Sequence, residues 1–367
     1  MSARKLLAAF GSPQAVFDAG PAARRTVLTR DIPALGVAPE GMVEQLARTM
    51  AWLQGDAPAE RALLSLADPR YPAALLEAAD PPLLLFAEGD LRLLSRPAVA
   101  IVGSRHATPQ GENNARAFAE VLSLAGVAVV SGLARGIDAA AHEGALAALP
   151  QGANLAGGAP GGSTSVGSTI AVVGTGLLQI YPKAHTALAR RIAQHGLLLS
   201  EFLLDTPALR ANFPKRNRIV AALARGTLVV EAAVQSGSLI TARLASEMGR
   251  EVLAIPGSIH APQARGCHAL IKQGAKLVET AQDVLEELRV DVPVARHPGV
   301  VDAGPQEAPG ADDPLLLALG FDPVSQEALS ARTGMGPAEL GARLLELELS
   351  GDVARLPGQL FQRLGRA

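Results

Sequence analysis

The stretch from residue 210 to residue 218 concentrates side chains that bind anions and stack on bases. It holds four cations and one aromatic ring, in a chain in which only 3% of the residues are aromatic. The cations are Arg210, Lys215, Arg216 and Arg218, and the ring is that of Phe213. Cations neutralise phosphates and an aromatic face stacks on unpaired bases, so this composition suits single-stranded nucleic acid. A solvated basic turn is the alternative, because runs of charge are often only surface.

Small residues follow several predicted strands, at positions where a parallel sheet binds its ligands. Ser236-Gly237-Ser238 is expected to form a tight turn that opens a helix after a buried strand. Five further glycines come directly after other apolar runs, namely Gly103, Gly132, Gly174, Gly176 and Gly257. Ligands of such sheets lie at the carboxyl ends of the strands, and glycine lets a phosphate approach main-chain N–H groups. Any single one could simply be required by its turn, but five favour a binding face.

Titratable side chains elsewhere do not complete a catalytic set. Asp138 and His142 stand four residues apart and could pair on one helix face. Glu201 and Glu231 each end an apolar run. A further group is His260, Cys267 and His268, whose adjacent cysteine and histidine have a poor spacing for a tetrahedral zinc site. We interpret all of these as structural, and expect no enzyme activity, no metal and no cofactor.

Six apolar runs alternate with segments of helical length and must position these residues. The runs are 98–102, 127–130, 169–173, 197–199, 227–230 and 252–255. Strands that are apolar throughout and alternate with helices indicate a parallel sheet covered on both faces. Pro214 predicts an extended lead-in within the basic stretch, followed by a helix with an apolar stripe from Ile219. The fold class is therefore α/β.

Proline and glycine divide the chain into four parts. Residues 1–90 are expected to form a small helical domain, in which Met42, Val43, Leu46, Met50 and Leu53 recur at helical spacing, with a helix-hairpin-helix or related module as one reading. Residues 91–289 carry the alternating pattern, 290–312 form a linker, and 313–367 predict three helices and a hairpin, as in a winged helix. The third of these helices is acidic, which favours a protein contact over a DNA groove.

A Gly/Ala/Ser-rich segment at 150–168 is predicted to be an insertion without a packed core. Within it, residues 162–169 imitate a phosphate-binding loop, but serine replaces the lysine and the segment precedes a strand instead of following one. ATP hydrolysis is therefore not expected there.

Composition sets the outer bounds on location and partners. The 367 residues carry a net charge of −2, which divides into −1 over residues 1–97, +4 over residues 98–289 and −5 over residues 290–367. An anionic partner is therefore expected at the middle segment. The single cysteine fits a reducing compartment, and no apolar run approaches the roughly 18 residues of a membrane span. A cytoplasmic protein without a membrane contact is the expectation.

Six ordered motifs between about Leu83 and Leu288 resemble the DNA-processing protein A (DprA, also called Smf) family. They are residues 100–105 (AIVGSR), 130–138 (VSGLARGID) with His142, 170–176 (IAVVGTG) with Tyr181-Pro182, 213–218 (FPKRNR), 230–242, and 249–257. The resemblance implies an extended Rossmann-like fold, flanked by a small N-terminal helical domain of the SAM or helix-hairpin-helix type and by a C-terminal winged helix.

The resemblance also implies a function. Members bind single-stranded DNA without catalysis and load the recombinase RecA onto it during natural transformation, usually as homodimers. The DNA-binding residues carried over, or suggested by their neighbourhood, are Gly103, Ser104, Arg105, Arg210, Phe213, Lys215, Arg216, Asn217, Arg218, Ser236, Gly237 and Ser238. Two alternatives stay open: a hydrolase of nucleotides or nucleoside monophosphates in the same crevice, with Glu231 as acid or base, and an adaptor that contacts RecA through the acidic C-terminal module.

Overall fold

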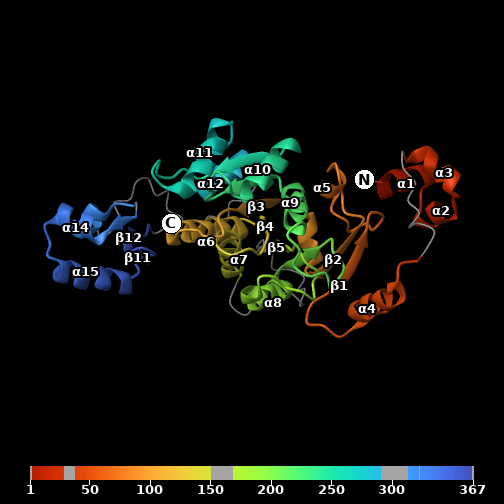
Figure 1. Ribbon diagram of the computed structural model, residues 1–367, viewed down its shortest axis with the longest axis horizontal. Helices are drawn as coiled ribbons and strands as arrows, with labels where there is room; N and C mark the ends of the chain where they lie inside the picture. The colour runs from red at the N-terminus through yellow and green to blue at the C-terminus, as the bar shows by residue number, and fades with distance from the viewer. Residues whose placement is uncertain (1, 29–37, 150–167, 291–312, 322, 366–367) are drawn as a thin grey trace, which may run out of the picture.

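The computed structural model describes residues 2–28, 38–149, 168–290, 313–321 and 323–365. Its centre is a nine-stranded sheet with the order β1-β2-β6-β5-β4-β3-β7-β8-β9, and the small C-terminal module lies to one side (Figure 1). The predicted insertion at 150–168, apart from Ser168, and the predicted linker, apart from Val290, fall outside the described residues.

The central strands match the six apolar runs of the sequence. They are β3 (Ala98–Val102), β4 (Ala128–Ser131), β5 (Thr169–Val172), β6 (Leu197–Ser200), β7 (Gly226–Val229) and β8 (Glu251–Ala254). All six run parallel, as does the two-residue β9 (Lys276–Leu277) at one edge. Every residue of β3 to β7 is buried, which explains why these strands carry apolar side chains on both faces. The predicted parallel sheet is confirmed.

The expected boundary at residue 90 is wrong, because the sheet begins earlier. β1 (Arg61–Ser65) and β2 (Leu84–Gly89) form an antiparallel pair, and β2 joins β6 antiparallel with Phe86 opposite Ser200. The prolines between these two strands mark a connection within the sheet and not a passage between domains.

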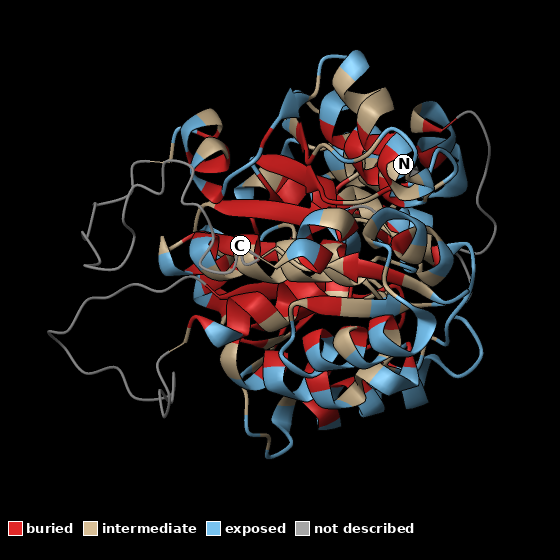
Figure 2. Cartoon of the chain, turned by 90° about the vertical axis from the view of Figure 1, so that its left-hand side faces the viewer, coloured by how far each residue is buried: buried red, intermediate tan, exposed pale blue. Residues whose placement is uncertain are grey.

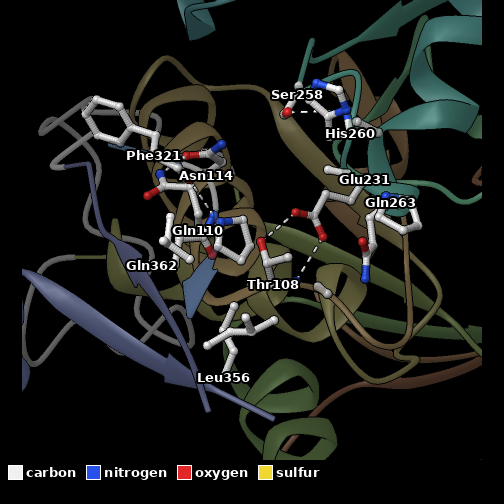
Figure 3. Close-up of a pocket in the computed structure, with 18 of the residues that line it drawn as sticks. Thr108, Gln110, Asn114, Glu231, Ser258, His260, Gln263, Phe321, Leu356 and Gln362 are labelled. Atoms are coloured by element: carbon white, nitrogen blue, oxygen red, sulfur yellow. Dashed lines mark hydrogen bonds between the residues drawn. The ribbon is translucent and has the colours of Figure 1, made fainter. Parts of the chain in front are cut away.

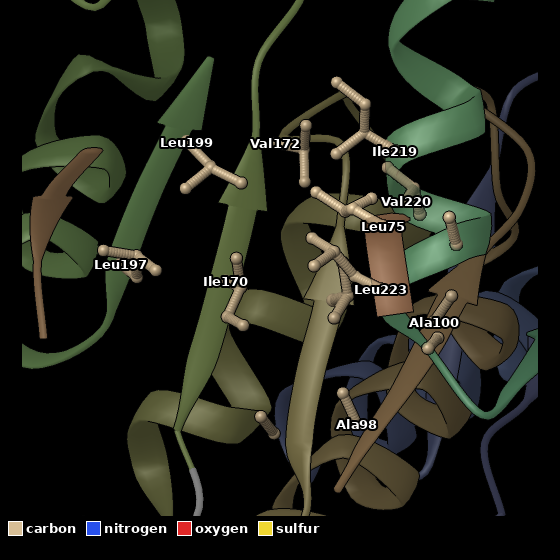
Figure 4. Packing of buried hydrophobic residues seen from close by; sticks show 14 of the residues in the cluster. Leu75, Ala98, Ala100, Ile170, Val172, Leu197, Leu199, Ile219, Val220 and Leu223 are labelled. Carbon is tan, nitrogen blue, oxygen red and sulfur yellow. The ribbon is translucent and has the colours of Figure 1, made fainter. Parts of the chain in front are cut away.

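Helices cover both faces of the sheet. One face packs against α5 (Ala73–Leu76), α9 (Asn212–Leu223), α10 (Ser238–Glu247) and α11 (Arg265–Lys272). The other packs against α6 (Pro109–Leu124), α7 (Ile137–Ala147), α8 (Thr186–His195) and α12 (Ala281–Glu287). Figure 4 shows Ile219, Val220 and Leu223 of α9 next to strand side chains such as Val172 and Ala100. In Figure 2 the buried strands form the centre, and the exposed residues lie on the outer sides of the helices.

The flanking regions are helical as expected, with one correction. α1 (Ser2–Phe10), α2 (Pro13–Asp18) and α3 (Pro21–Val27) share a small core of Leu6, Val16 and Leu28. α4 (Met42–Gln54) forms where the spacing predicts it, but Met42, Val43, Leu46 and Met50 are exposed. The helix instead buries Thr49 and Trp52, and the Trp52 ring packs edge-on against Phe86.

The C-terminal module has the predicted winged-helix elements. They are α13 (Pro314–Leu319), α14 (Gln326–Thr333), α15 (Pro337–Leu349), β11 (Val353–Leu356) and β12 (Leu360–Arg363), with a short β10 (Val324–Ser325) paired to β12. Its core is separate from those of the large sheet and centres on residues such as Leu329, Leu340 and Leu344. Across the described residues of the whole chain, no helix is both long and apolar enough to cross a bilayer.

Candidate nucleic-acid interface

The basic stretch is helical from Asn212 onward, and this decides which cations are free. Pro214 lies in the first turn of α9, where a missing N–H breaks no helical hydrogen bond, so it does not impose the extended lead-in that was predicted. Asn212, Arg216 and Ile219 fall at spacings of four and three on the buried face of the helix. Lys215 points to solvent instead.

Arg216 does not lie where a phosphate could reach it. Only 4% of its surface is accessible, and its Nη1 donates to the carbonyl oxygens of Gly132, at 2.5 Å, and of Val172. Burial lowers the pKa of Arg216 to about 10, an effect that the buried carboxyl of Asp138 opposes. The guanidinium therefore stays charged at neutral pH, and it joins the ends of β4 and β5 to α9. The predicted phosphate contact is replaced by a structural role.

Arg218 is also committed within the protein. Its Nη2 donates to a carboxylate oxygen of Glu201, and its Nη1 donates to the carbonyl oxygen of Asp80 at 2.6 Å. The side chain is 18% exposed. Arg218 thus ties α9 to the end of β6 and to the connection between β1 and β2, and its predicted phosphate contact is not supported.

Phe213 and two neighbours form an aromatic and cationic cluster at the carboxyl ends of the strands, in which Arg105 and Tyr181 are exposed and Phe213 is half-buried. The rings of Phe213 and Tyr181 lie 5.6 Å apart between centroids, tilted by 54°. The guanidinium carbon of Arg105, which follows β3, is 5.8 Å from the centre of the Phe213 ring. Tyr181 is 50% exposed, so the cluster presents an aromatic edge and a cation to solvent together.

Tyr181 was missed as a site residue, although it stands in a motif that we compared. Tyr181 lies at the end of the loop after β5, and the sequence alone does not give the path of that loop. The available signal in the sequence was the rarity of tyrosine, because the chain has only two tyrosines.

Four exposed cations share this edge of the sheet. Arg105 follows β3, Arg135 lies in the loop between β4 and α7, and Arg210 and Lys215 come after β6. Within the described ranges none of the four takes part in an ion pair, whereas the nearby Glu201 is bound to Arg218. Arg135 was not predicted as a candidate site residue. The edge therefore carries positive charge that the protein itself does not neutralise.

The five strand-end glycines lie where a side chain would meet other protein atoms. A Cβ at Gly103 would lie 2.6 Å from Ile137 Cγ1, and one at Gly257 would lie 2.7 Å from Ala264 Cβ. At Gly132 it would meet Arg216 Nη1 at 2.5 Å, and at Gly174 it would meet Phe213 Cδ1 at 3.0 Å. At Gly176 it would meet two carbonyl oxygens. Phosphate access at these glycines stays a prediction, and Gly132 and Gly174 in addition leave room for Arg216 and Phe213.

The turn at Ser236-Gly237-Ser238 opens α10 as predicted and leaves donors near the surface. Nothing lies within 4 Å of a Cβ built on Gly237, which is the N-cap of α10 and makes no side-chain cap hydrogen bond. The hydroxyls of Ser236 and Ser238 are 2.7 Å apart. Asn217 bridges this turn to α9, since its Nδ2 donates to the Gly237 carbonyl at 3.5 Å and its Oδ1 accepts from Arg216 Nε at 3.3 Å. Ser104 lies beside the edge but donates its N–H to the Glu231 carbonyl at 2.7 Å.

The crevice where nucleotides usually bind in such sheets is filled by a carboxylate. The strand order reverses between β3 and β7, and the helix after β3 is α6. Glu231, after β7, accepts the N–H of Thr108 at 2.9 Å and its hydroxyl at 2.6 Å, and Thr108 in turn caps Gly111 at 3.0 Å. Pro109 has no N–H to offer. The start of α6 is therefore already occupied by an anion, which burial leaves with a raised pKa.

A hollow of about 1530 Å³ lies beside this crevice, between the central domain and the winged helix. Figure 3 shows the Glu231–Thr108 hydrogen bonds in its wall, with Phe321 and Gln362 across from Ser258 and His260. The Gly365 N–H donates to Gln110 Oε1 at 2.7 Å, which ties the end of the winged helix to α6. This contact covers the crevice further.

Three of the remaining titratable candidates, Asp138, His142 and Cys267, are buried and bonded within the protein. Asp138 does not pair with His142, because its Oδ2 accepts the N–H groups of Gly132 at 3.1 Å and Ala134 at 3.3 Å. His142 Nδ1 contacts Thr169 Oγ1 at 2.6 Å, and burial lowers the pKa of this imidazole to about 3. Cys267 is fully buried, and burial raises the pKa of its thiol to about 11. The residues described contain no group of three or more side chains placed to hold a metal ion.

Comparison with known families decides the membership of the chain. The family described as DNA recombination-mediator protein A matches residues 62–289, which contain all of the central sheet except the first residue of β1. The chain belongs to this family. The DprA winged helix domain matches residues 302–359, in agreement with the elements described above. The resemblance found in the sequence motifs is thereby confirmed.

Relatives in the family cover most of the chain. Protein Smf of Escherichia coli (strain K12) is 42% identical over 301 residues, which is 81% of this chain and 76% of that protein. The X-ray structure of DNA processing protein A from Streptococcus pneumoniae superposes with a TM-score of 0.60 and 37% identity, over 78% of this chain and 92% of that one. A Helicobacter pylori family structure, which addresses the single-stranded DNA binding mode of that protein, gives 0.53 and 30%, over 63% and 97%.

Proposed function

We propose that the protein binds single-stranded DNA along the carboxyl edge of its sheet. The observation that carries this proposal is the cluster of Phe213, Tyr181 and Arg105, set among cations that form no ion pair within the described residues. Rings accept stacked bases and cations hold phosphates, which is how sequence-tolerant single-strand binders work. The Helicobacter pylori relative, described by its single-stranded DNA binding mode, supports the same ligand class.

The strand order gives the proposed path of the DNA. In strand order, the edge presents Arg210 after β6, Tyr181 after β5, Arg135 after β4, Arg105 after β3 and the Ser236–Ser238 turn after β7. Phe213 and Lys215 lie on α9 above these strand ends, where the Phe213 ring contacts both Tyr181 and Arg105. These five strands span roughly 19 Å at about 4.8 Å between neighbours, enough for several nucleotides. Arg216, Arg218 and Asn217 support this edge from within, and the donors of the turn, which include the Gly237 N–H, would take one further phosphate.

Base preference should be weak, because neither phosphate contacts nor stacking select a base. Each stacked base contributes about 1–3 kcal/mol, so charge neutralisation should dominate the affinity. The rings of Phe213 and Tyr181 can stack on any base, and stacking does not distinguish the edge of one base from that of another. We therefore propose binding to single strands of any sequence.

We further propose that the bound strand is handed to the recombinase RecA during natural transformation, by a cytoplasmic, non-catalytic homodimer. Membership of the recombination-mediator family supports the mediator role. The absence of catalysis is supported by Glu231, whose two carboxylate oxygens are both engaged by Thr108. The nucleotide hydrolase alternative requires that same carboxylate to be free, so we do not adopt it.

The test compares a labelled single-stranded oligonucleotide with the same sequence as a duplex, by fluorescence anisotropy across a salt series. We expect tighter binding of the single strand and a slope of log affinity against log salt of about −0.7 for each phosphate contacted. Oligonucleotides of different sequence should bind alike. Salt-insensitive binding, or turnover of nucleoside monophosphates in a parallel assay, would contradict the proposal.

A further inference from the structure

Helix α15 presents an apolar stripe to solvent. Ala338, Ala342, Leu345 and Leu349 follow one another at spacings of four, three and four residues, so they line one face of the helix. All four are exposed, Leu345 to 55% and Leu349 to 81%. The opposite face, with Leu340, Leu344 and Leu347, already supplies the core of the module. The exposed stripe is therefore not needed for folding.

Acidic side chains flank the stripe, and no free cation on α15 balances them. Glu339, Glu346 and Glu348 are all exposed. The only cation of the helix, Arg343, binds Asp313 at 2.8 Å and also pairs with Glu346. Glu339 and Glu348 take part in no ion pair within the described ranges. The face is thus apolar along its centre and negative at its sides.

The position of α15 makes this face available. It is the third helix of a winged helix, the one that enters the DNA groove in nucleic-acid-binding members of that fold. In Figure 1 α15 lies on the outer side of the module, away from α6 and the large sheet. Phosphates would meet glutamates there, so DNA is excluded as its ligand by charge. A second copy of the same face is excluded for the same reason, because it would set glutamate against glutamate.

We propose that the exposed face of α15 binds a different protein, through a helix whose apolar row is flanked by lysine or arginine. Leu345 and Leu349 would anchor the partner helix, since apolar side chains at this spacing fit between those of another amphipathic helix. The glutamates would complement its cations and set its orientation. The winged helix would then recruit a basic protein partner, while the carboxyl edge of the sheet stays free for DNA. This inference is independent of the proposed DNA site.

The test uses the full chain and two labelled synthetic peptides. One is an amphipathic helix of leucine and lysine, and the other replaces every lysine with glutamate. We expect the chain to bind the lysine peptide and not the glutamate peptide. The double variant Leu345→Ser/Leu349→Ser should weaken binding of the lysine peptide at least tenfold. The matched control is Leu317→Ser, which alters a side chain that is 63% exposed on α13, and it should leave binding unchanged.

Three results would overturn the inference. They are equal loss of binding in the control variant, binding of both peptides alike, and a change in the sedimentation mass of the chain alone in the double variant, which would make the occupant a second copy. Affinity for a single-stranded oligonucleotide is measured in parallel. It should be unaffected by Leu345→Ser/Leu349→Ser, so failure of this inference and failure of the DNA proposal give different data.

Discussion

Lys215 and Arg216 are adjacent and carry the same charge, yet the structure gives them opposite roles. Replacing each with alanine should therefore produce two different defects. Lys215 is exposed and takes part in no ion pair within the described residues, whereas Arg216 is 4% exposed and donates to the carbonyl oxygens of Gly132 and Val172. Only Arg216 neutralises the buried carboxyl of Asp138.

Arg216→Ala should destabilise the fold by about 3–5 kcal/mol, because it leaves a buried charge without its partner and two carbonyl groups without a donor. Lys215→Ala should change the free energy of unfolding by no more than about 0.5 kcal/mol, as at other exposed positions. It should instead lower the magnitude of the salt slope for single-stranded DNA by about 0.7, the value expected for one lost phosphate contact. The effect should be the same for every oligonucleotide sequence.

The two quantities are measured by urea unfolding followed by circular dichroism and by fluorescence anisotropy over a salt series. Arg216→Lys serves as the conservative control, since it keeps the charge and should recover part of the stability. The reasoning is refuted if Arg216→Ala unfolds like the parent protein and loses salt dependence as Lys215→Ala does. Such a result would place the guanidinium in solvent, against DNA.

Three further predictions concern the rings, a glycine and a histidine. Phe213→Ala or Tyr181→Ala should each weaken single-strand binding by about 1–3 kcal/mol with the salt slope unchanged, as anisotropy would show, and a loss confined to one base type would contradict stacking. Gly132→Ala should lower the melting temperature, because its Cβ would lie 2.5 Å from Arg216 Nη1, and an unchanged melting curve would argue against that contact. His142 has a pKa of about 3 when folded and about 6.5 when unfolded, so below pH 6.5 only the unfolded chain gains the proton. Stability should then fall by up to about 1.4 kcal/mol for each pH unit down to pH 3, a slope that urea unfolding should find reduced in His142→Gln.

The sheet could be predicted from the sequence because its strands are buried on both faces. An apolar run such as 98–102 reports that burial directly. β1 and β2 escaped notice because prolines between them also suggest a domain boundary, and because β1 alternates buried and half-buried residues instead of forming a continuous buried run. The edge strand β9, with two exposed residues, leaves no apolar signal at all.

The binding role of 210–218 stays a prediction, but the structure shows which of its cations are exposed, and this could be predicted only in part. Charge and aromatic content pointed to 210–218, but the exposure of each cation depends on whether that segment is extended or helical. Once Pro214 is placed in the first turn of α9, the helical period sends Arg216 inward and Lys215 outward. Tyr181 and Arg135 reach the site through loops after β5 and β4, whose paths depend on tertiary contacts.

Glu231 occupies the start of α6, and this affects whether the protein would bind free nucleotides. Because that carboxylate belongs to the chain, its effective concentration at Thr108 exceeds that of a dissolved competitor, and a nucleotide would have to displace it. Small phosphates would then bind poorly at the start of α6. A polymer that contacts many cations at once would still bind to the protein. This α/β sheet, of a kind that binds mononucleotides in many proteins, would therefore bind a DNA strand without competition from free nucleotides.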